Sequence, residues 1–185
     1  MMFVRTERLL LRPGWAEDAP ALAKAIARED IVRNLARAPW PYRPYHAEEF
    51  LGMAKPFRFP SLLVFERTDG APRLVGSCGI GKTDEGGAEL GYWIAVDSWG
   101  RGYATEAARA VVAAARGLGH RRLEAGHFID NPASGRVLEK VGFRATGQIV
   151  RRFSRGRAAS AKCATYTLDL SEGDRTGDDD VRMAA

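Results

Sequence analysis

Hydrophobic and polar positions follow two different periods along this chain. Apolar residues recur every three or four positions over 19–27, and again from Ala104 to Leu118, which predicts two amphipathic helices. Between these helices, β-branched and aromatic runs bounded by turn residues predict strands at 61–67, 73–81 and 88–96. The order of helix, three-stranded meander and helix indicates an α/β domain.

Shorter runs on either side extend this pattern. We expect further strands at 8–12, 121–129, 143–153 and 164–170, and further helices at 46–54 and 132–141. Asn131 followed by Pro132 is typical of a helix start, because Asn caps a helix and Pro fits its first turn. A right-handed crossover through the helix from Ala104 makes strands 88–96 and 121–129 parallel, within a sheet that is otherwise mostly antiparallel.

The segment 31–45 shows neither period and sets three prolines among Trp40, Tyr42 and Tyr45. Two interpretations stay open: one wall of a substrate cleft, built from rigid backbone and aromatic contact area, or a packed loop between helices. The nearby His46 is expected to be a capping or surface residue rather than a catalyst.

The length and composition predict one domain. A chain of 185 residues with 45% hydrophobic residues can bury one substantial core. We expect this domain to span residues 1–170, and we expect the polar, acidic segment 171–185 to be a disordered tail.

Charge, cysteine content and hydropathy argue against several functional classes. The formal net charge of +5 favours anionic partners, but the arginines are scattered, so no nucleic-acid binding is required. Cys78 and Cys163 fit no metal-ligand spacing and predict packed thiols, so no metal site is expected. No apolar run approaches the roughly 18 residues of a membrane span, and no signal peptide is evident, so we expect a cytoplasmic protein without membrane contact.

Gly100 and Gly102 stand where the strand ending at Val96 turns into the helix from Ala104. Without side chains at these positions, several amide N–H groups can point outward at the positive end of a helix dipole. Such a helix start binds phosphate, although a glycine pair is also compatible with a simple tight turn. The spacing fits neither a nucleoside triphosphate loop nor a dinucleotide-binding motif.

Trp99-Gly-Arg-Gly-Tyr-Ala104 resembles the pyrophosphate loop of the GNAT acetyltransferases, whose usual pattern is Arg/Gln-x-x-Gly-x-Gly/Ala. Trp99 departs from the usual Arg or Gln and is similar to the RimJ/RimL branch of protein N-terminal acetyltransferases. Asn131 to Phe143 is similar to the second signature of that branch, and Thr6 to Pro13 is similar to how the branch opens. The resemblance implies the GNAT acyl-CoA acetyltransferase fold, with a mixed, mostly antiparallel twisted sheet, flanking helices and splayed parallel central strands.

The resemblance also implies how acetyl-CoA, the expected co-substrate, is held. The backbone after the central strand binds the pyrophosphate, at Trp99, Gly100, Arg101, Gly102, Tyr103, Ala104 and Thr105. The strand end at Trp93 and Ile94 pairs with the pantetheine arm by strand addition and, at a local bulge, points an amide at the acetyl oxygen. Asn131 and Ser134 are expected to contact the same arm.

Two residues have catalytic roles in the resemblance. Glu89 is expected to be the general base and Ser134 the proton donor to the leaving thiolate. Each has a structural alternative: Glu89 as a strand-end carboxylate paired with an arginine, and Ser134 as a helix-start hydrogen-bonding residue. Tyr92 and Trp93 must face opposite sides of the strand, but the period alone does not say which side is which.

The resulting expectation is an acetyl-CoA-dependent N-acetyltransferase acting by direct amine attack, because neither cysteine lies in the signature stretch. An α-amine with a pKa near about 7.8 costs about 1 kcal/mol to deprotonate at neutral pH, against about 4.6 kcal/mol for a lysine. This favours a protein or peptide N-terminus as acceptor. The alternatives are a small amine, such as an antibiotic, polyamine or amino acid, and a non-catalytic acyl-CoA sensor. A homodimer formed through a closing strand is compatible with the sequence.

Overall fold

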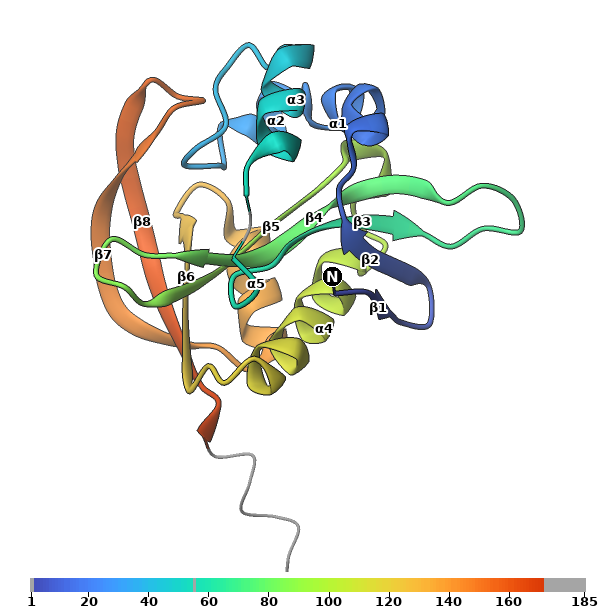
Figure 1. Ribbon diagram of the computed structural model, residues 1–185. Coiled ribbons are helices and arrows are strands. Elements are labelled where there is room, and N and C mark those ends of the chain that lie inside the picture. The colour runs from blue at the N-terminus through green and yellow to red at the C-terminus, as the bar shows by residue number, and fades with distance from the viewer. Residues whose placement is uncertain (1, 55, 172–185) are drawn as a thin grey trace, which may run out of the picture.

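The computed structural model describes residues 2–54 and 56–171 and contains one mixed sheet between two layers of helices (Figure 1). Its strand order is β1-β2-β3-β4-β5-β6-β8-β7. The strands are β1 Val4–Arg5, β2 Leu9–Pro13, β3 Ser61–Glu66, β4 Arg73–Lys82, β5 Ala88–Ile94, β6 Arg122–Phe128, β7 Arg144–Ser154 and β8 Ala159–Asp169. All neighbouring strands pair antiparallel except β5 and β6, which are parallel, so the expected α/β fold class is confirmed.

Helices cover both faces of the sheet. The helical elements are η1 Ala16–Asp18, α1 Ala19–Ile26, α2 Glu29–Val32, α3 Pro44–Gly52, η2 Val96–Ser98, α4 Tyr103–Gly117 and α5 Pro132–Val141. α1, α2 and α3 lie on one face, named here the α1–α3 face, and α4 and α5 lie on the other, the α4–α5 face (Figure 1). None of the helices in the described part of the chain is long and apolar enough to cross a bilayer.

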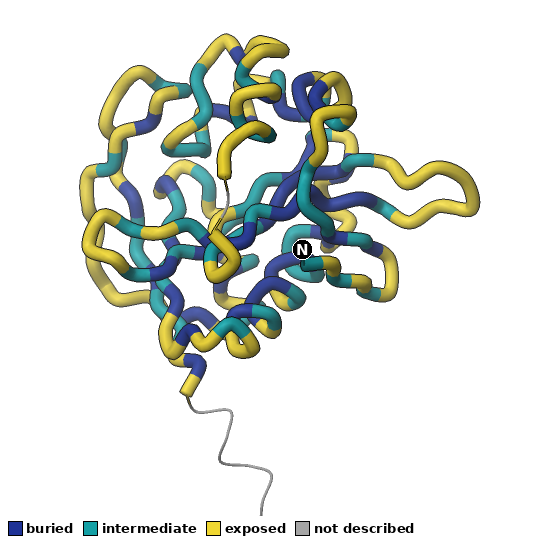
Figure 2. The backbone as a smooth tube through the Cα atoms, in the orientation of Figure 1, coloured by how far each residue is buried: buried dark blue, intermediate teal, exposed yellow. Residues whose placement is uncertain are grey.

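The sequence of β3 is a continuous apolar run because both faces of this strand are buried. Its alternate residues Leu62 and Val64 join the core under α4, whereas Leu63 and Phe65 join the core under α1 and α2. Because both faces of this strand are covered, every position favours an apolar side chain. Figure 2 shows the resulting buried stretch running through the middle of the sheet.

Several element boundaries differ from the sequence-based expectation. The segment 31–45 is not wholly irregular, because α2 begins at Glu29 and buries Ile31 and Val32. The helix expected at 46–54 begins earlier, at Pro44, whose ring fits a first helical turn. The last strand begins at Ala159 rather than at 164, because pairing with β7 outweighs the weak strand preference of its small residues. The tail predicted for 171–185 lies outside the described residues, apart from Ser171.

The parallel pair β5–β6 is joined at one register position, Glu89 with Glu124. β5 meanwhile stays paired with β4 up to Ile94. The β6-facing edge of β5 is therefore left without a ladder partner beyond this position, as expected for splayed central strands. The local bulge expected near Ile94 is not found, because the β4–β5 register is continuous from Lys82 with Ala88 to Gly76 with Ile94.

Candidate active site

The loop between β5 and α4 holds its glycines in a conformation that L side chains rarely adopt. Gly100 has φ 73° and Gly102 has φ 80°. α4 begins at the next residue, Tyr103. Within the described residues, the backbone N–H groups of 100–105 donate to no protein acceptor. These groups and the helix dipole behind them form a site of the kind that binds phosphate oxygens.

A carboxylate from the end of β3 anchors this loop. Glu66 accepts hydrogen bonds from the Tyr103 hydroxyl at 2.5 Å and from Arg101 at 2.7 Å. It also pairs with Arg73 at 2.6 Å. The hydrogen bonds from Tyr103 and Arg73 lower the pKa of Glu66 to about 2, so the anchor is ionised at neutral pH.

The segment leading into β2 forms a second anchor. Arg8 donates to the carbonyl oxygen of Arg101 at 3.0 Å and pairs with Glu106, in the first turn of α4, at 2.6 Å. Glu106 also accepts the hydroxyl of Thr6 at 2.6 Å. The sequence alone assigns no role to Arg8, Glu66 or Glu106, because their partners are far away along the chain.

Trp99 closes the end of β5. Its indole Nε1–H donates to the carbonyl oxygen of Ile94 at 2.7 Å, while half of the side chain stays exposed. The tryptophan that replaces the usual Arg or Gln of the motif therefore has a structural role, which is to bond the end of β5. An indole satisfies the last strand carbonyl and leaves the loop amides to other acceptors.

Tyr92, not Trp93, lies beside the expected proton donor. The Tyr92 hydroxyl is 2.8 Å from the Ser134 Oγ and 3.0 Å from the Ser134 carbonyl oxygen. Burial raises the pKa of Tyr92, so its hydroxyl stays protonated. The side chain of Trp93 packs in the core on the α1–α3 face instead. Strand alternation predicted that these two residues separate, but it could not assign their sides.

Asn131 lies at the N-cap of α5, but its side chain makes no capping hydrogen bond. Its side-chain amide therefore has no capping partner among the described residues. It sits one helical turn from Ser134, whose N–H donates to the Asn131 carbonyl oxygen at 3.1 Å. The prediction that Asn131 is the N-cap residue of this helix is confirmed, although its side chain makes no capping bond. Its position is that of a cap, with the amide left for another contact.

Glu89 is paired with an arginine from the hairpin formed by β7 and β8, named here the closing hairpin. Arg152 Nη1 of β7 lies 2.5 Å from Glu89 Oε1. Both side chains are part-exposed. The pairing with an arginine that the sequence left open for Glu89 is therefore present, and a role for Glu89 as base has to account for Arg152.

The space beside β5 is open two residues further along the strand. A Cβ built on Gly91 would have no atom within 4 Å.

Other candidate residues predicted from the sequence lie away from this arrangement. Tyr42 and Pro44 line a cavity of about 420 Å³ with α1, which does not include β5. His46 accepts the N–H of Arg43 at 2.9 Å, so it caps α3 as predicted. Cys78 and Cys163 are buried free thiols. Among residues 2–54 and 56–171, no cluster of His, Cys, Asp and Glu is placed to hold a metal ion.

A family model described as an acetyltransferase (GNAT) domain matches residues 8–144. The uncharacterized N-acetyltransferase p20 of Bacillus licheniformis is 25% identical over 171 residues, which cover 88% of this chain and 93% of the relative. The uncharacterized N-acetyltransferase YoaA of Bacillus subtilis is 28% identical over 159 residues, covering 81% and 86%.

Solved structures share the fold. A GNAT-family acetyltransferase from Bacillus anthracis superposes with a TM-score of 0.76 at 24% identity, covering 91% of this chain and 98% of the other. RimL, a ribosomal L7/L12 alpha-N-protein acetyltransferase in complex with coenzyme A, gives 0.73 at 16%, covering 91% and 98%. The microcin C7 self immunity acetyltransferase MccE, in complex with acetyl-CoA and AMP, gives 0.73 at 16%, covering 89% and 94%.

Proposed function

Because this chain belongs to the GNAT family of acetyl-CoA-dependent N-acetyltransferases, we propose that its acceptor is the α-amine of a protein or peptide N-terminus. The acetyl group passes directly to that amine in a ternary complex. The observation that carries the proposal is the open edge of β5, which has Glu89 and the space above Gly91 on its α1–α3 face and Tyr92, bonded to Ser134 of α5, on its α4–α5 face.

The residues around the open edge fit acetyl-CoA. The unpartnered amides of 100–105 suit its pyrophosphate, and the β5 edge up to Ile94 offers backbone groups to its amide-containing arm. Asn131 is connected to β5 by two hydrogen bonds in series: the Ser134 N–H donates to the Asn131 carbonyl oxygen, and the Tyr92 hydroxyl donates to the Ser134 carbonyl oxygen. Trp93 and Ile94 contribute through backbone position, because their side chains pack in the two cores.

The bound coenzyme supplies an activated acetyl thioester. Glu89 accepts the proton that the acceptor amine loses, directly or through one water. The Ser134 hydroxyl, held by the protonated Tyr92, donates a hydrogen bond toward the leaving sulfur. A thiol with a pKa near about 8.5 needs little acid assistance to leave, so we expect Ser134 to matter less than Glu89.

Two considerations favour a peptide N-terminus. An α-amine is deprotonated at a cost of about 1 kcal/mol near neutral pH, which a single carboxylate can meet. The fold is also shared with RimL, an alpha-N-protein acetyltransferase. A small amine is the second candidate; MccE, which shares the fold, was solved with a small molecule, AMP, beside acetyl-CoA.

The test is acetyl-CoA-dependent release of CoA thiol with a panel of acceptors. The panel contains peptides with free N-termini, the same peptides blocked at the N-terminus with an internal lysine, polyamines, aminoglycosides and aminoacyl nucleotides. Mass spectrometry locates the acetyl group on each product. We expect turnover of free N-terminal peptides alone. Turnover restricted to small amines would replace the peptide acceptor with the second candidate.

A Glu89→Gln variant tests the base within the same assay. We expect kcat to fall about a hundredfold or more, because the amide cannot accept the proton. Acetyl-CoA binding, measured by calorimetry, should stay unchanged. An unaltered kcat in this variant would remove Glu89 from the mechanism without changing the family assignment.

A further inference from the structure

Arg152 reaches Glu89 from a distant strand of the sheet. It lies on β7, the outermost strand of the closing hairpin, and β8 and β6 separate β7 from β5. The guanidinium nevertheless lies 2.5 Å from Glu89 Oε1. The long side chain of Arg152 therefore extends across two strands to reach one carboxylate oxygen of Glu89.

Gly126 of β6 makes room for this crossing. A Cβ at this position would lie 3.6 Å from Arg152 Nη1 and 2.9 Å from the Sγ of Cys163. The space above Gly126 is thus occupied by the arginine and the buried thiol. An added Cβ would first clash with the thiol of Cys163, and a longer side chain would also enter the space through which Arg152 passes.

The pair stands beside a second carboxylate. Glu89 and Glu124 are register partners at the bridge that joins β5 to β6, so their side chains point to the same face, about 5 Å apart at the backbone. Ionised carboxylates on neighbouring strands repel each other, and a cation between them relieves the repulsion. The titratable groups that face Arg152 are Glu89, Glu124 of β6 and Cys163 of β8. Burial opposes the charge of Arg152, but these neighbours outweigh it and raise the pKa of Arg152.

We propose that Arg152 is a positioning residue that holds Oε1 of Glu89, offsets its negative charge and leaves the other carboxylate oxygen for the acceptor. Arg152 Nη1 donates a hydrogen bond to Oε1 of Glu89, and Oε2 of Glu89 has no hydrogen-bond partner among the described residues. Oε2 is then the atom that receives the proton from the acceptor amine. This inference rests on the proposed function, because it concerns the base that the function requires.

The proposal predicts a specific change in pH dependence. In Arg152→Gln, Glu89 and Glu124 repel each other without a cation, so the acid limb of the kcat profile should move up by about 1 pH unit. The maximal kcat should fall about tenfold, because the carboxylate loses its orientation. The KM and Kd for acetyl-CoA should not change.

Three further variants separate positioning from structural support. Arg152→Lys keeps the cation and should restore most of the acid limb. Adding Glu124→Gln to Arg152→Gln removes the repulsion and should return the limb toward its wild-type position. Arg151→Gln is the matched control, because Arg151 is the neighbouring arginine, points to the other face and bonds the carbonyl oxygen of Ser160.

A measurement without acceptor distinguishes failure of this inference from failure of the proposed function. Carboxyl ¹³C NMR of glutamate-labelled protein, assigned with Glu89→Gln, follows the Glu89 titration directly. We expect the Glu89 pKa to rise in Arg152→Gln and not in Arg151→Gln. A titration unmoved by Arg152→Gln overturns the inference. A titration that moves in a protein that acetylates no peptide upholds the effect on Glu89 and rejects the peptide acceptor.

Discussion

At the scale of single residues, the site depends on charged side chains that bind backbone or carboxylate groups from distant segments. Glu66 is the clearest case, because one carboxylate accepts Tyr103, Arg101 and Arg73. Its side chain is 14% exposed, so these bonds are shielded better than most surface ion pairs. The glycine loop between β5 and α4 is therefore anchored by a residue of β3, which is not part of the loop.

Replacing Glu66 with Gln should weaken both the loop and its ligand. We expect the free energy of unfolding to fall by about 1 kcal/mol, since solvent partly screens the arginine partners. Acetyl-CoA should bind about fivefold more weakly, because Tyr103 and Arg101 lose their anchor. Calorimetric titration and thermal unfolding measure these effects, and Asp69→Asn, in the turn after β3, is the control. Unchanged acetyl-CoA affinity in Glu66→Gln would contradict the anchoring role.

The same carboxylate should give the protein a defined acid sensitivity. The folded-state pKa of Glu66 is lowered to about 2 from an ordinary value of 4.5. The stability that it contributes is complete above the ordinary value and is lost as the pH falls toward about 2. The difference in melting temperature between wild type and Glu66→Gln should therefore shrink across this window. A difference that stays constant down to the acid end would argue against the ion pairs as its source.

At the scale of elements, the turn from β5 into α4 sets the position of the phosphate-type site. The left-handed backbone at Gly100 and Gly102 leads directly into the helix at Tyr103. This brings a helix start and unpartnered amides to the end of the splayed strand. The turn is therefore a local device, and local substitutions can test it.

Gly102→Ala should distort this turn. With φ 80°, an L residue costs about 1 to 2 kcal/mol, whereas the new Cβ would meet Arg8 Nη2 at an ordinary 3.5 Å. The strain is thus in the backbone, and acetyl-CoA affinity should fall about tenfold. Gly117→Ala, in α4 with nothing within 4 Å, is the control and should stabilise the helix by about 0.5 to 1 kcal/mol. Equal effects of both substitutions on acetyl-CoA binding would reject the role of the turn.

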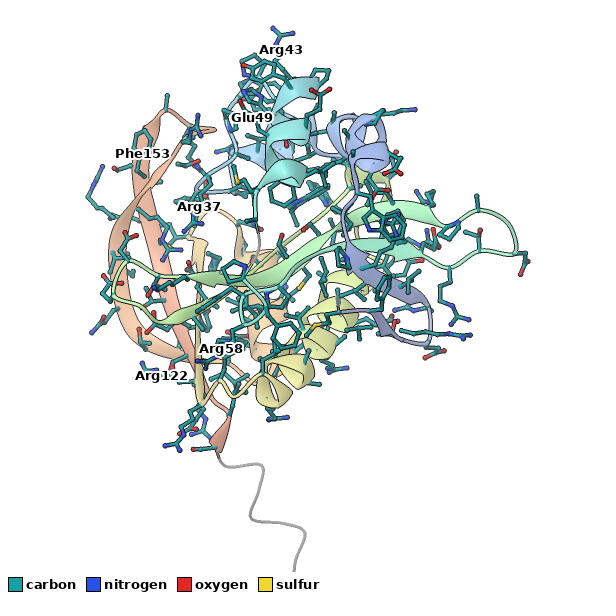
Figure 3. The ribbon with its side chains drawn as sticks, viewed as in Figure 1. Arg37, Arg43, Glu49, Arg58, Arg122 and Phe153 are labelled. Carbon is teal, nitrogen blue, oxygen red and sulfur yellow. The ribbon has the colours of Figure 1, made fainter. Side chains whose placement is uncertain are left out.

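At the scale of the whole molecule, the closing hairpin β7–β8 contacts a segment from the first quarter of the chain. Its tip lies against the residues after α2, where Ser154 donates to the carbonyl oxygen of Leu35 at 2.8 Å and Arg155 N–H to that of Ala36 at 3.0 Å (Figure 1). Arg37, labelled in Figure 3, follows this segment and donates to the carbonyl oxygen of Lys82 at 3.4 Å. The α1–α3 layer is thus bonded both to the hairpin and to the end of β4.

Gly156→Ala should loosen this docking. A Cβ on Gly156 would lie 2.5 Å from the carbonyl oxygen of Val32, so one backbone must shift, at a cost of about 1 to 3 kcal/mol. We expect faster hydrogen exchange over 32–36, a higher KM for the acceptor and unchanged acetyl-CoA affinity. Gly70→Ala, in the open β3–β4 turn, is the matched control. If exchange over 32–36 stays slow, the hairpin does not hold this layer in place.

Features that depend on neighbouring residues could be predicted from the amino-acid sequence. Periodicity located α1, α4 and the central strands, because a covered helix or strand repeats its apolar positions locally. The glycine pair and the two signatures led to the family, and the family model agrees. The predicted boundaries were wrong where long-range contacts determine them. At Ala159, for example, pairing with β7 extends a strand of small residues.

Which side chains meet could be learned only from the three-dimensional fold. Glu89 and Arg152 are 63 positions apart, and Glu66 and Tyr103 are 37 apart, so no local pattern pairs them. Tyr92 and Trp93 could each face either side, and the fold packs one residue against each of the two cores. The backbone pattern of one strand is a local property, whereas the partner of each side chain follows from the order of strands in the sheet.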